Sequence, residues 1–528
     1  MKKINLTKTA VTLMWLAVLC VPGYAEKLIL LHTNDTHSTI EPLADGTGGI
    51  IQRKALIDSI RKKEKNVVLI DAGDVVQGTL FFNYFGGDVE YPLMDMAGYD
   101  IRILGNHEFD NGPEDLAKRY KNVKGRALSA NYDFTGTELE GIFEPYTIRQ
   151  FDGKKIGFIG INIDPESIIA HKNVNFKFKE IIPLANDLAS HLKRDLGCDL
   201  VVAVSHIGYE KVNDKTTDVE LAQASKDIDI IIGGHTHTLI DPNKPEEYPS
   251  LIENAEGRMV RVAQTGKQGR FLGKIEIDLD ELSTGDGRNW NYSLIPVTDR
   301  FSDEELDSEM IAFLQPYREK VDSVNRVVVA HCAYTLEKER LGGLANMTAD
   351  FGYEYTNQIA DSLRERNPEF PRVDMSIMNV GGISHEMPAG EIYEGQILAT
   401  YPFSNKVNII KVKGEDVIEA LRVSAAKGGE AVSGNVIVVT DPKGELLRVM
   451  IDGREMDPDK DYIIGTIDYV AEGNDDLRSL ARHTKLWEGD EDLSAPILRW
   501  VKGQEKAGIM VNPDPRPRFV TDIKYETK

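Results

Sequence analysis

The sequence predicts an α/β fold in two parts joined by a helix. With 528 residues, the chain is longer than one hydrophobic core usually organises, so two domains are expected. Short apolar runs alternate with helix-like segments from residue 26 to about residue 296. A charged helix-like segment covers residues 302–324, and a new apolar run begins at Val327. These observations place a connecting helix between two α/β parts.

Five apolar runs in the first part have the composition of buried strands. They are nearly continuous in hydrophobicity and rich in β-branched residues, as expected of strands buried on both faces. They are residues 28–31, 67–70, 156–161, 200–204 and 228–232. Four of the five end at a polar cluster. Because α/β sheets usually hold their sites beyond the carboxyl ends of strands, the clusters are candidate functional residues.

Residues 302–324 carry the signals of the connecting helix. Ser302 is a preferred N-cap residue, and the acidic residues that follow it suit a first helical turn. The second part runs to about residue 522 and contains several Gly-rich turns. The expected division is a signal peptide at 1–25, a first domain at 26–300, a linker helix at 301–325 and a second domain at 326–525.

The first 25 residues have the features of an export signal. Lys2 and Lys3 precede an apolar run, and small residues end at Ala25. The run is too short to span a membrane as a helix. Cys20 is a candidate for lipid attachment, but Leu19 stands where a small residue is needed, which argues against an anchor. We therefore expect an exported protein, periplasmic or at the cell surface, without a stable membrane span.

Net charge and cysteine content indicate which partners and crosslinks to expect. The formal net charge of −23 repels nucleic-acid polymers and anionic membranes, so a small anionic substrate is expected. Beyond the leader only Cys198 and Cys332 remain, in different predicted domains, which does not suggest a disulfide. Cys198 directly precedes an apolar run and is typical of a buried inert thiol.

Five short polar clusters in the first part supply metal-ligating side chains. They are Asp35-Thr-His37, Gly73-Asp74, Gly105-Asn106-His107-Glu-Phe-Asp110, Ser205-His206 and Gly234-His235-Thr-His237. Each one alone is commonly a turn or a cap, but all five in succession make an improbable coincidence. Carboxylate, imidazole and amide donors suit divalent ions such as manganese, zinc, iron or cobalt. We predict a site for two metal ions that hydrolyses phosphate esters.

Spacing within the clusters predicts local geometry. Asp35 and His37 are two residues apart, so in an extended segment both side chains would point to the same side. His107 and Asp110 are three apart and would share a face in a helical turn. The carboxylate would then keep the imidazole protonated, so we expect His107 to stabilise phosphate or act as a general acid.

The order of these clusters resembles that of the calcineurin-like metallophosphoesterases. Three segments of the second part resemble the nucleotide-binding domain of the 5′-nucleotidase and UDP-sugar hydrolase family: Asn379-Val-Gly-Gly-Ile383, Tyr401-Pro-Phe403-Ser-Asn405 and Tyr469-Val-Ala-Glu-Gly-Asn-Asp475. The resemblance covers nearly the whole chain after the leader. It implies a four-layer αββα metallophosphoesterase sandwich, joined by a helix to a C-terminal α/β nucleotide-binding domain.

The resemblance also implies roles for individual residues. One metal would be surrounded by Asp35, His37, Asp74 and His237. The other would be surrounded by Asp74, Asn106, His206 and His235. His107, paired with Asp110, would be the catalytic imidazole. In the second domain, Phe403 and Tyr469 would hold a base between two aromatic rings, and Asn379 and Asp475 would line the same pocket.

Two positions depart from the family pattern. Ser384 follows Gly-Gly-Ile where the family has an arginine, and Lys338 stands where a second pocket arginine would fall. Serine carries no charge, and lysine lacks the bidentate fork of arginine. Recognition of the ribose or of a second phosphate is therefore left open.

The resemblance implies a 5′-nucleotidase in which a metal-bound hydroxide attacks the phosphorus of a nucleotide. One alternative is a 2′,3′-cyclic-nucleotide 2′-phosphodiesterase with 3′-nucleotidase activity, and another is a hydrolase of a different small phosphate ester. A third is a non-catalytic surface protein that binds metal and nucleotide. Rotation of the second domain about the linker helix is expected from the resemblance, and the sequence favours neither a monomer nor a dimer.

Overall fold

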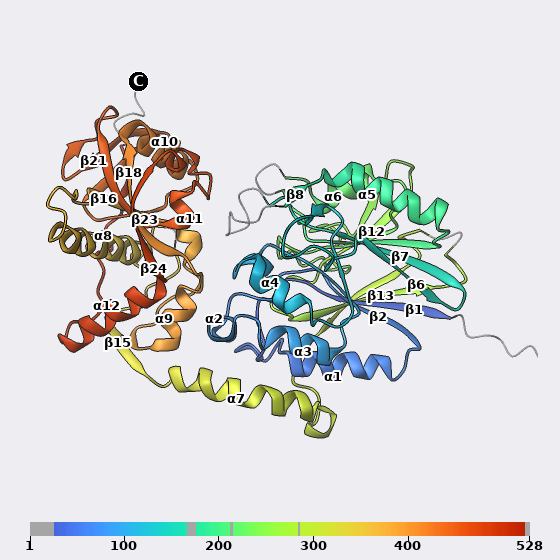
Figure 1. Cartoon of the computed structure of the whole chain (residues 1–528). Helices are drawn as coiled ribbons and strands as arrows, with labels where there is room; N and C mark the ends of the chain where they lie inside the picture. The colour runs from blue at the N-terminus through green and yellow to red at the C-terminus, as the bar shows by residue number, and fades with distance from the viewer. Residues whose placement is uncertain (1–25, 166–175, 212–214, 283–285, 340, 523–528) are drawn as a thin grey trace, which may run out of the picture.

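The computed structural model describes residues 26–165, 176–211, 215–282, 286–339 and 341–522. The predicted export signal at 1–25 lies outside these residues. Within them, no helix combines the length and the hydrophobicity needed to cross a membrane. Figure 1 shows two α/β units side by side, with helix α7 (Ser308–Val324) passing between them along the bottom of the view.

The N-terminal unit contains two six-stranded sheets. The first has the order β14 (Asn291–Pro296), β13 (Phe271–Asp278), β1 (Lys27–Thr33), β2 (Asn66–Asp71), β3 (Ile101–Ile103) and β4 (Arg126–Leu128). The second has the order β11 (Leu251–Glu253), β12 (Met259–Ala263), β10 (Ile230–Ile232), β9 (Leu200–Ser205), β7 (Lys154–Ile161) and β6 (Tyr146–Phe151). Four of the five predicted apolar runs lie in β1, β2, β7 and β9, and the fifth, 228–232, ends in β10.

Helices cover the outer faces of both sheets. Leu28 and Leu30 of β1 pack into a core shared with the second sheet and with α5 (Ile181–Ser190). Ile29 and Leu31 face the opposite way and pack with α1 (Ile50–Arg61) and α3 (Glu90–Ala97). Such two-sided burial explains why these strands are almost continuously apolar. The predicted four-layer αββα sandwich is confirmed.

The parallel strands of both sheets bring their carboxyl ends to one region. β1, β2, β3 and β4 are mutually parallel neighbours, as are β7, β9, β10 and β12. The loops that follow β1, β2, β3, β9 and β10 carry the five polar clusters. The topology therefore gathers segments that are far apart in the sequence.

The connecting helix differs from its predicted extent. Ser302 caps a short 3-10 turn, Asp303–Glu305, and its capping box with Glu305 is completed within that turn. Leu306 is extended, and α7 begins only at Ser308, where Asp307 accepts a hydrogen bond from the backbone N–H of Met310 at 2.9 Å. The predicted helix start at Ser302 was wrong. Two N-cap residues lie close together, and the first of them, Ser302, caps a separate 3-10 turn.

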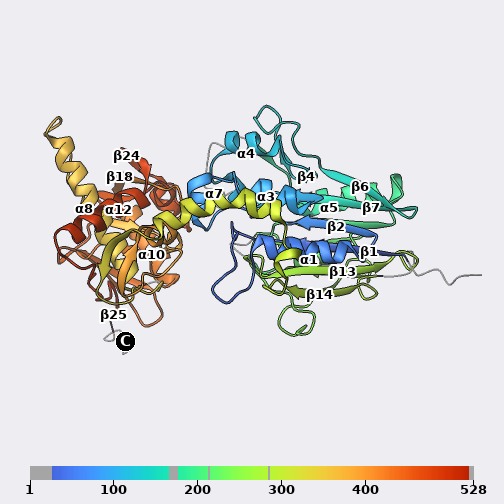
Figure 2. The same ribbon diagram turned by 90° about the horizontal axis from the view of Figure 1, so that it is seen from below.

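Helix α7 packs along the N-terminal unit. Met310, Leu314 and Val321 are buried in the core that contains α1 and α3. Arg318 donates to both carboxylate oxygens of Glu41, at 2.5 and 2.9 Å. Figure 2 shows α7 leading from this unit to the C-terminal one. These contacts fix the helix to the N-terminal unit.

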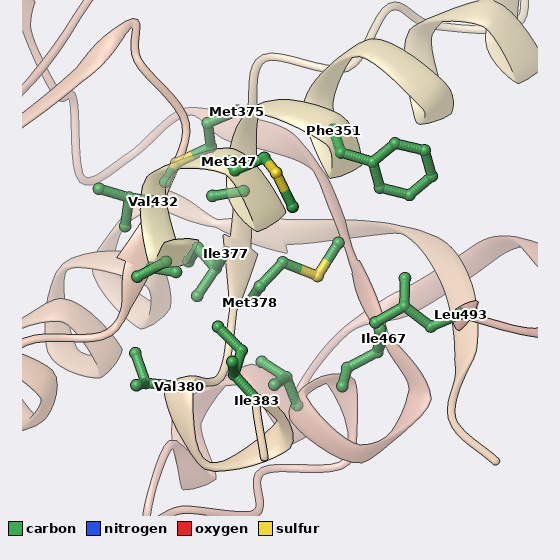
Figure 3. Close-up of a cluster of buried hydrophobic side chains, with 14 of the residues drawn as sticks. Met347, Phe351, Met375, Ile377, Met378, Val380, Ile383, Val432, Ile467 and Leu493 are labelled. Atoms are coloured by element: carbon green, nitrogen blue, oxygen red, sulfur yellow. The ribbon is translucent and has the colours of Figure 1, made fainter. Parts of the chain in front are cut away.

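The C-terminal unit is built on a five-stranded sheet. Its order is β19 (Ala431–Val432), β16 (Met375–Met378), β23 (Asp461–Ile467), β18 (Lys406–Lys413) and β24 (Thr484–Asp492). Helix α8 (Gly343–Arg364) packs on this sheet, and Figure 3 shows Met347 and Phe351 of α8 in the core with Met378 of β16.

The unit also contains a four-stranded sheet, with the order β22 (Arg454–Glu455), β21 (Leu446–Ile451), β20 (Val436–Thr440) and β25 (Phe519–Thr521). The two units touch through α2 (Leu80–Phe85) and α9 (Glu394–Thr400). There, the Asn83 amide donates to the carbonyl of Leu398 at 3.4 Å.

Candidate metal centre

The loops that carry the predicted ligands are tightly folded. Asp35 (φ 49°) and His37 (φ 45°) are in the left-handed region, so the prediction of an extended segment was wrong. Asp74, His235 and His237 also have positive φ, at 56°, 77° and 56°. Non-glycine residues in this region are uncommon and cost energy, and they gather at functional sites.

Backbone hydrogen bonds hold these loops against one another. The N–H of Asp35 donates to Gly73 at 2.9 Å, and the N–H of His37 donates to Asp74 at 3.0 Å. The N–H of His235 donates to the carboxylate of Asp35 at 3.0 Å. The left-handed turns are therefore fixed by contacts between loops that follow different strands.

One group of ligand atoms comes from Asp35, His37 and His237. Their donor atoms all lie within 4.8 Å of one another. The Nε2 atoms of His37 and His237 are 2.9 Å apart, and Nε2 of His237 lies 3.6 Å from Oδ1 of Asp35. These three residues could share one cation.

A second group comes from Asp74, His206 and His235, again within 4.8 Å. The amide oxygen of Asn106 lies 3.1 Å from Nδ1 of His235, which brings the fourth predicted donor to this group. Asp74 also groups with His37 and His107. Its carboxylate therefore lies between the two sets, as a bridging ligand would.

The surroundings of His206 fit a cation. Its Nδ1 lies 2.6 Å from the carbonyl of Ala72, which can only accept, so Nδ1 carries the proton. Its Nε2 faces Oδ2 of Asp74 at 3.2 Å. Burial acts to lower the pKa of His206, but the charge of Asp74 outweighs it and raises that pKa to about 10. A positive charge between the two side chains, either a proton or a divalent cation, is therefore stabilised.

Burial sets the protonation of the remaining donors. Desolvation raises the pKa of Asp35 to about 7 and lowers the pKa of His37 and His235 to about 3. Burial also acts to raise the pKa of Asp74, but the charges of His206 and His107 outweigh it and hold that pKa well below its usual value. Neutral imidazoles beside an ionised carboxylate are the forms that bind divalent cations.

His107 has a different environment from the other histidines. It opens a 3-10 turn, His107–Phe109, that brings its Nδ1 within 2.8 Å of Oδ2 of Asp110. Burial acts to lower the pKa of His107, but the nearby carboxylates, with Asp110 the strongest, raise it to about 10. Its imidazole is therefore a cation at neutral pH, able to donate a proton or to stabilise negative charge.

Two buried residues of this site were missed by sequence reasoning. The carboxylate of Glu108 accepts hydrogen bonds from the N–H groups of Asp74, Val75 and Gly105, at 3.0, 2.8 and 2.6 Å. Asn34 bonds to the carboxylate of Asp35 at 2.6 Å and to the carbonyl of Gly266 at 2.7 Å. Glu108 lies within the third cluster and Asn34 directly precedes the first, and these positions were the only signal in the sequence.

The C-terminal unit brings an aromatic ring to this centre. The ring of Phe403 lies 6.2 Å from the ring of His107, with 32° between their planes. Asp475 (φ 56°) connects the other predicted pocket residues, because its oxygens lie 3.1 Å from the Asn379 amide and 3.3 Å from the Tyr469 hydroxyl. Asn379, Tyr469 and Asp475 thus form one connected set.

A cavity lies beside Phe403, with an empty volume of about 290 Å³ that includes the part open to solvent. Its lining is mainly apolar, with polar groups on Thr348, Asn379, Tyr401 and Asn405. It is formed by Thr348, Met378, Asn379, Gly382, Ile383, Tyr401, Phe403, Asn405, Ile467 and Leu493.

The two departures from the family pattern are neighbours. The ammonium group of Lys338 lies 3.5 Å from the carbonyl oxygen of Ser384. Burial, followed by the positive charge of Lys267 from the N-terminal unit, lowers the pKa of Lys338. Lys267 also acts on His237, so its charge reaches the metal centre as well.

Comparisons with known families match both parts of the chain. The calcineurin-like phosphoesterase family model matches residues 28–239, and the 5′-nucleotidase C-terminal domain model matches residues 343–482. Together they cover more than half of the chain.

Several characterised proteins are similar over most of the chain. The 5′-nucleotidase of Vibrio cholerae is 29% identical over 498 residues, which is 87% of each protein. The rat 5′-nucleotidase is 27% identical over 516 residues, 89% of this chain and 87% of its own. A trifunctional nucleotide phosphoesterase of Bacillus subtilis is 27% identical over 85% of this chain, which spans 32% of that longer protein.

Solved structures agree with these similarities. A 5′-nucleotidase precursor from Thermus thermophilus superposes with a TM-score of 0.77 at 26% identity, covering 94% of this chain and 99% of that one. The sulfate thiohydrolase SoxB of Thermus thermophilus shares the fold, with a TM-score of 0.66 at 16% identity over 95% of this chain and 97% of its own. The chain belongs to the 5′-nucleotidase family, with a calcineurin-like phosphoesterase domain at its N-terminal side, and is a metal-dependent phosphoester hydrolase.

Proposed function

We propose that this protein is an exported 5′-nucleotidase that releases phosphate from small nucleotides. The observation that carries the proposal is the contact between His107 and Phe403, because it joins a hydrolytic centre to an aromatic surface suited to a base. A ring near the catalytic imidazole allows one small molecule to reach both. The names of the relatives from Vibrio cholerae and rat support the same substrate class.

We assign the proposed ligands to two divalent cations, with the same division as in the sequence analysis. Asp35, His37, Asp74 and His237 would hold one divalent cation, and Asp74, Asn106, His206 and His235 would hold the other. When bound, two such cations supply an activated water and stabilise negative charge on the phosphoryl group. Their donor set of carboxylate, imidazole and amide suits manganese, zinc, iron or cobalt.

The protein side chains have separate tasks in this proposal. His107, kept protonated by Asp110, stabilises the charge that develops on the phosphate or donates a proton to the leaving oxygen. Phe403 and Tyr469 hold the base, while Asn379 and Asp475 bind polar groups nearby. We further propose that residues 26–300 hold the metals, 301–325 form the linker, and 326–525 hold the nucleoside.

A second candidate is a 2′,3′-cyclic-nucleotide 2′-phosphodiesterase with 3′-nucleotidase activity. Ser384 favours it, because a pocket without that guanidinium places fewer demands on the orientation of the nucleotide. The similarity to a trifunctional nucleotide phosphoesterase also supports a broader substrate range. Other small phosphate esters remain compatible with the same centre.

Product analysis separates these candidates. The purified protein would be given AMP, 3′-AMP, 2′,3′-cyclic AMP and simple sugar phosphates, each with added manganese, zinc or cobalt. Release of adenosine and phosphate from AMP supports the 5′-nucleotidase, whereas turnover of the cyclic compound and of 3′-AMP supports the alternative. If no nucleotide is hydrolysed but sugar phosphates are, the nucleotide proposal is wrong.

A further inference from the structure

A buried carboxylate lies behind the histidine ligands of the second sheet. Asp218 is the first residue of α6 (Asp218–Ala224) and is fully buried. Its Oδ1 accepts a hydrogen bond from the hydroxyl of Ser205 at 2.6 Å. Ser205 is the last residue of β9 and directly precedes His206, so this bond fixes the strand end from which that imidazole projects.

The same carboxylate reaches the loop that carries the other two histidines. The side-chain amide of Gln264 donates to Oδ2 of Asp218 at 3.4 Å and to the carbonyl of Gly234 at 2.8 Å. The oxygen of that amide accepts from the N–H of Thr238 at 3.0 Å. Gly234 precedes His235 and Thr238 follows His237, so Gln264 holds both ends of the short segment between them.

Two close backbone contacts leave Asp218 little freedom. A β-carbon at Gly233 would lie 2.0 Å from Oδ2 of Asp218, so glycine is required there by contact and not by an unusual φ. The N–H of Asp218 donates to the carbonyl of Gly208 at 2.7 Å, just beyond His206. The carboxylate is thus enclosed by the two loops that present the three imidazoles.

This arrangement is costly for a residue with a purely structural role. Among the residues that the structure describes, no lysine or arginine forms an ion pair with Asp218. Burial raises the pKa of Asp218 to about 7, which measures how poorly its charge is solvated. Buried carboxylates usually destabilise a fold relative to a neutral side chain of similar size, so a functional reason is expected.

We propose that Asp218 is a positioning residue of the metal centre, which sets the affinity for divalent cations by orienting His206, His235 and His237. It touches neither substrate nor metal, and it acts through Ser205 and Gln264. Outer hydrogen-bond partners of metal ligands typically change metal affinity or activity by about 10- to 100-fold when mutated. The inference rests on the proposed metal centre and not on which phosphate ester is hydrolysed.

The test compares metal binding by Asp218→Asn with that of the parent protein. Metal-free full-length protein would be titrated with Mn²⁺ by calorimetry, and thermal unfolding would be followed in parallel. We expect Mn²⁺ affinity to fall about 10- to 100-fold, with kcat largely recovered at saturating Mn²⁺. Recovery at high metal distinguishes a positioning role from a loss of folded protein.

Asp229→Asn is the matched control. Asp229 is also a buried carboxylate and directly precedes β10, but it accepts from the N–H of Val201 at 2.8 Å, near the opposite end of β9. It also pairs with Lys193 at 2.7 Å. Its loss should lower thermal stability and leave Mn²⁺ affinity unchanged. If both variants lose stability and bind Mn²⁺ as tightly as the parent, Asp218 has only a structural role and the proposal is overturned.

Ser205→Ala keeps the proposal testable if Asp218→Asn does not fold. This variant removes one hydrogen bond and leaves the carboxylate in place, so we expect a smaller loss of Mn²⁺ affinity. If Ser205→Ala binds Mn²⁺ as tightly as the parent, the inference is contradicted. A parent protein that binds Mn²⁺ but hydrolyses no nucleotide would contradict the proposed function alone.

Discussion

The rings of Phe403 and His107 lie 6.2 Å apart across the boundary between the two units. One ring comes from the loop before β18 and the other from the loop after β3, nearly three hundred residues earlier in the chain. The contact brings the proposed base-binding surface to the proposed catalytic imidazole. A substrate that contacts both rings must be small enough for its base to stack on Phe403 while its phosphate lies beside His107.

Phe403→Ala should weaken binding of nucleotides selectively. Stacking of a base on an aromatic ring contributes about 1–3 kcal/mol, so KM for AMP should rise by about 5- to 150-fold. Ribose 5-phosphate, which has the same phosphate but no base, is the control substrate. Equal losses with both compounds would show that Phe403 supports the fold of the site and does not bind the base.

His107→Ala should lower kcat by about 10²- to 10⁴-fold, as expected for the loss of a general acid or a charge-stabilising imidazole. Metal content, measured by mass spectrometry of the purified protein, should not change. His191→Ala is the control, because His191 forms a similar 2.8 Å pair with Asp195 on the exposed surface. A loss of bound metal in His107→Ala would instead assign this residue to the ligands.

Asp110→Asn should move the pH dependence of activity. Asp110 is the strongest of the carboxylates that raise the pKa of His107 above its usual value. Without that charge the imidazole loses its proton at a lower pH. If activity requires the protonated form, the alkaline limb of kcat/KM should shift to lower pH, with the acid limb unchanged. An unshifted alkaline limb would mean that another group controls it.

Removal of metal should abolish hydrolysis reversibly. After treatment with a chelator, activity should return on addition of Mn²⁺ or Co²⁺ to the parent protein. Asp74→Asn should recover little at any metal concentration, because its carboxylate groups with His206 and His235 and also with His37 of the other set. Asp133→Asn, a change of a carboxylate that bonds to its own loop at Thr135, should recover as the parent does.

His32→Phe should make the protein more resistant to acid. His32 is fully buried, and neither ring nitrogen has a hydrogen-bond partner among the residues that the structure describes. Burial lowers its pKa to about 3. The unfolded chain takes up this proton near pH 6.5 and the folded one does not, so stability falls as pH drops from 6.5 toward 3. The slope from this group is about 1.4 kcal/mol per pH unit.

Denaturant unfolding at pH 7 and at pH 5 measures this effect. The parent should lose more free energy of unfolding between the two pH values than His32→Phe does. The ring stacks on Tyr292 with 5.9 Å between centroids, so the aromatic replacement keeps the packing. Equal losses in both proteins would show that other groups dominate the acid response.

The sequence by itself determined the order of the ligands and the fold that holds them. Continuous apolar runs identified strands buried on both faces, and polar clusters at the ends of four of the five runs marked the sheet edge where Asp35, Asp74 and His206 lie. This worked because strand burial and the position of ligand loops are both local properties of the chain. The pairing of His107 with Asp110 was also local, since three residues span one turn.

Tertiary structure alone decided the features that depend on contacts between distant segments. In the sequence, Asp218 has the position of an ordinary acidic residue in the first turn of a helix, because Thr217 and Glu220 complete the capping box of that helix. Only the packing of α6 against two ligand loops buries that carboxylate. The left-handed turns at Asp35 and His37 are likewise held by bonds to the loop after β2, which no local pattern encodes.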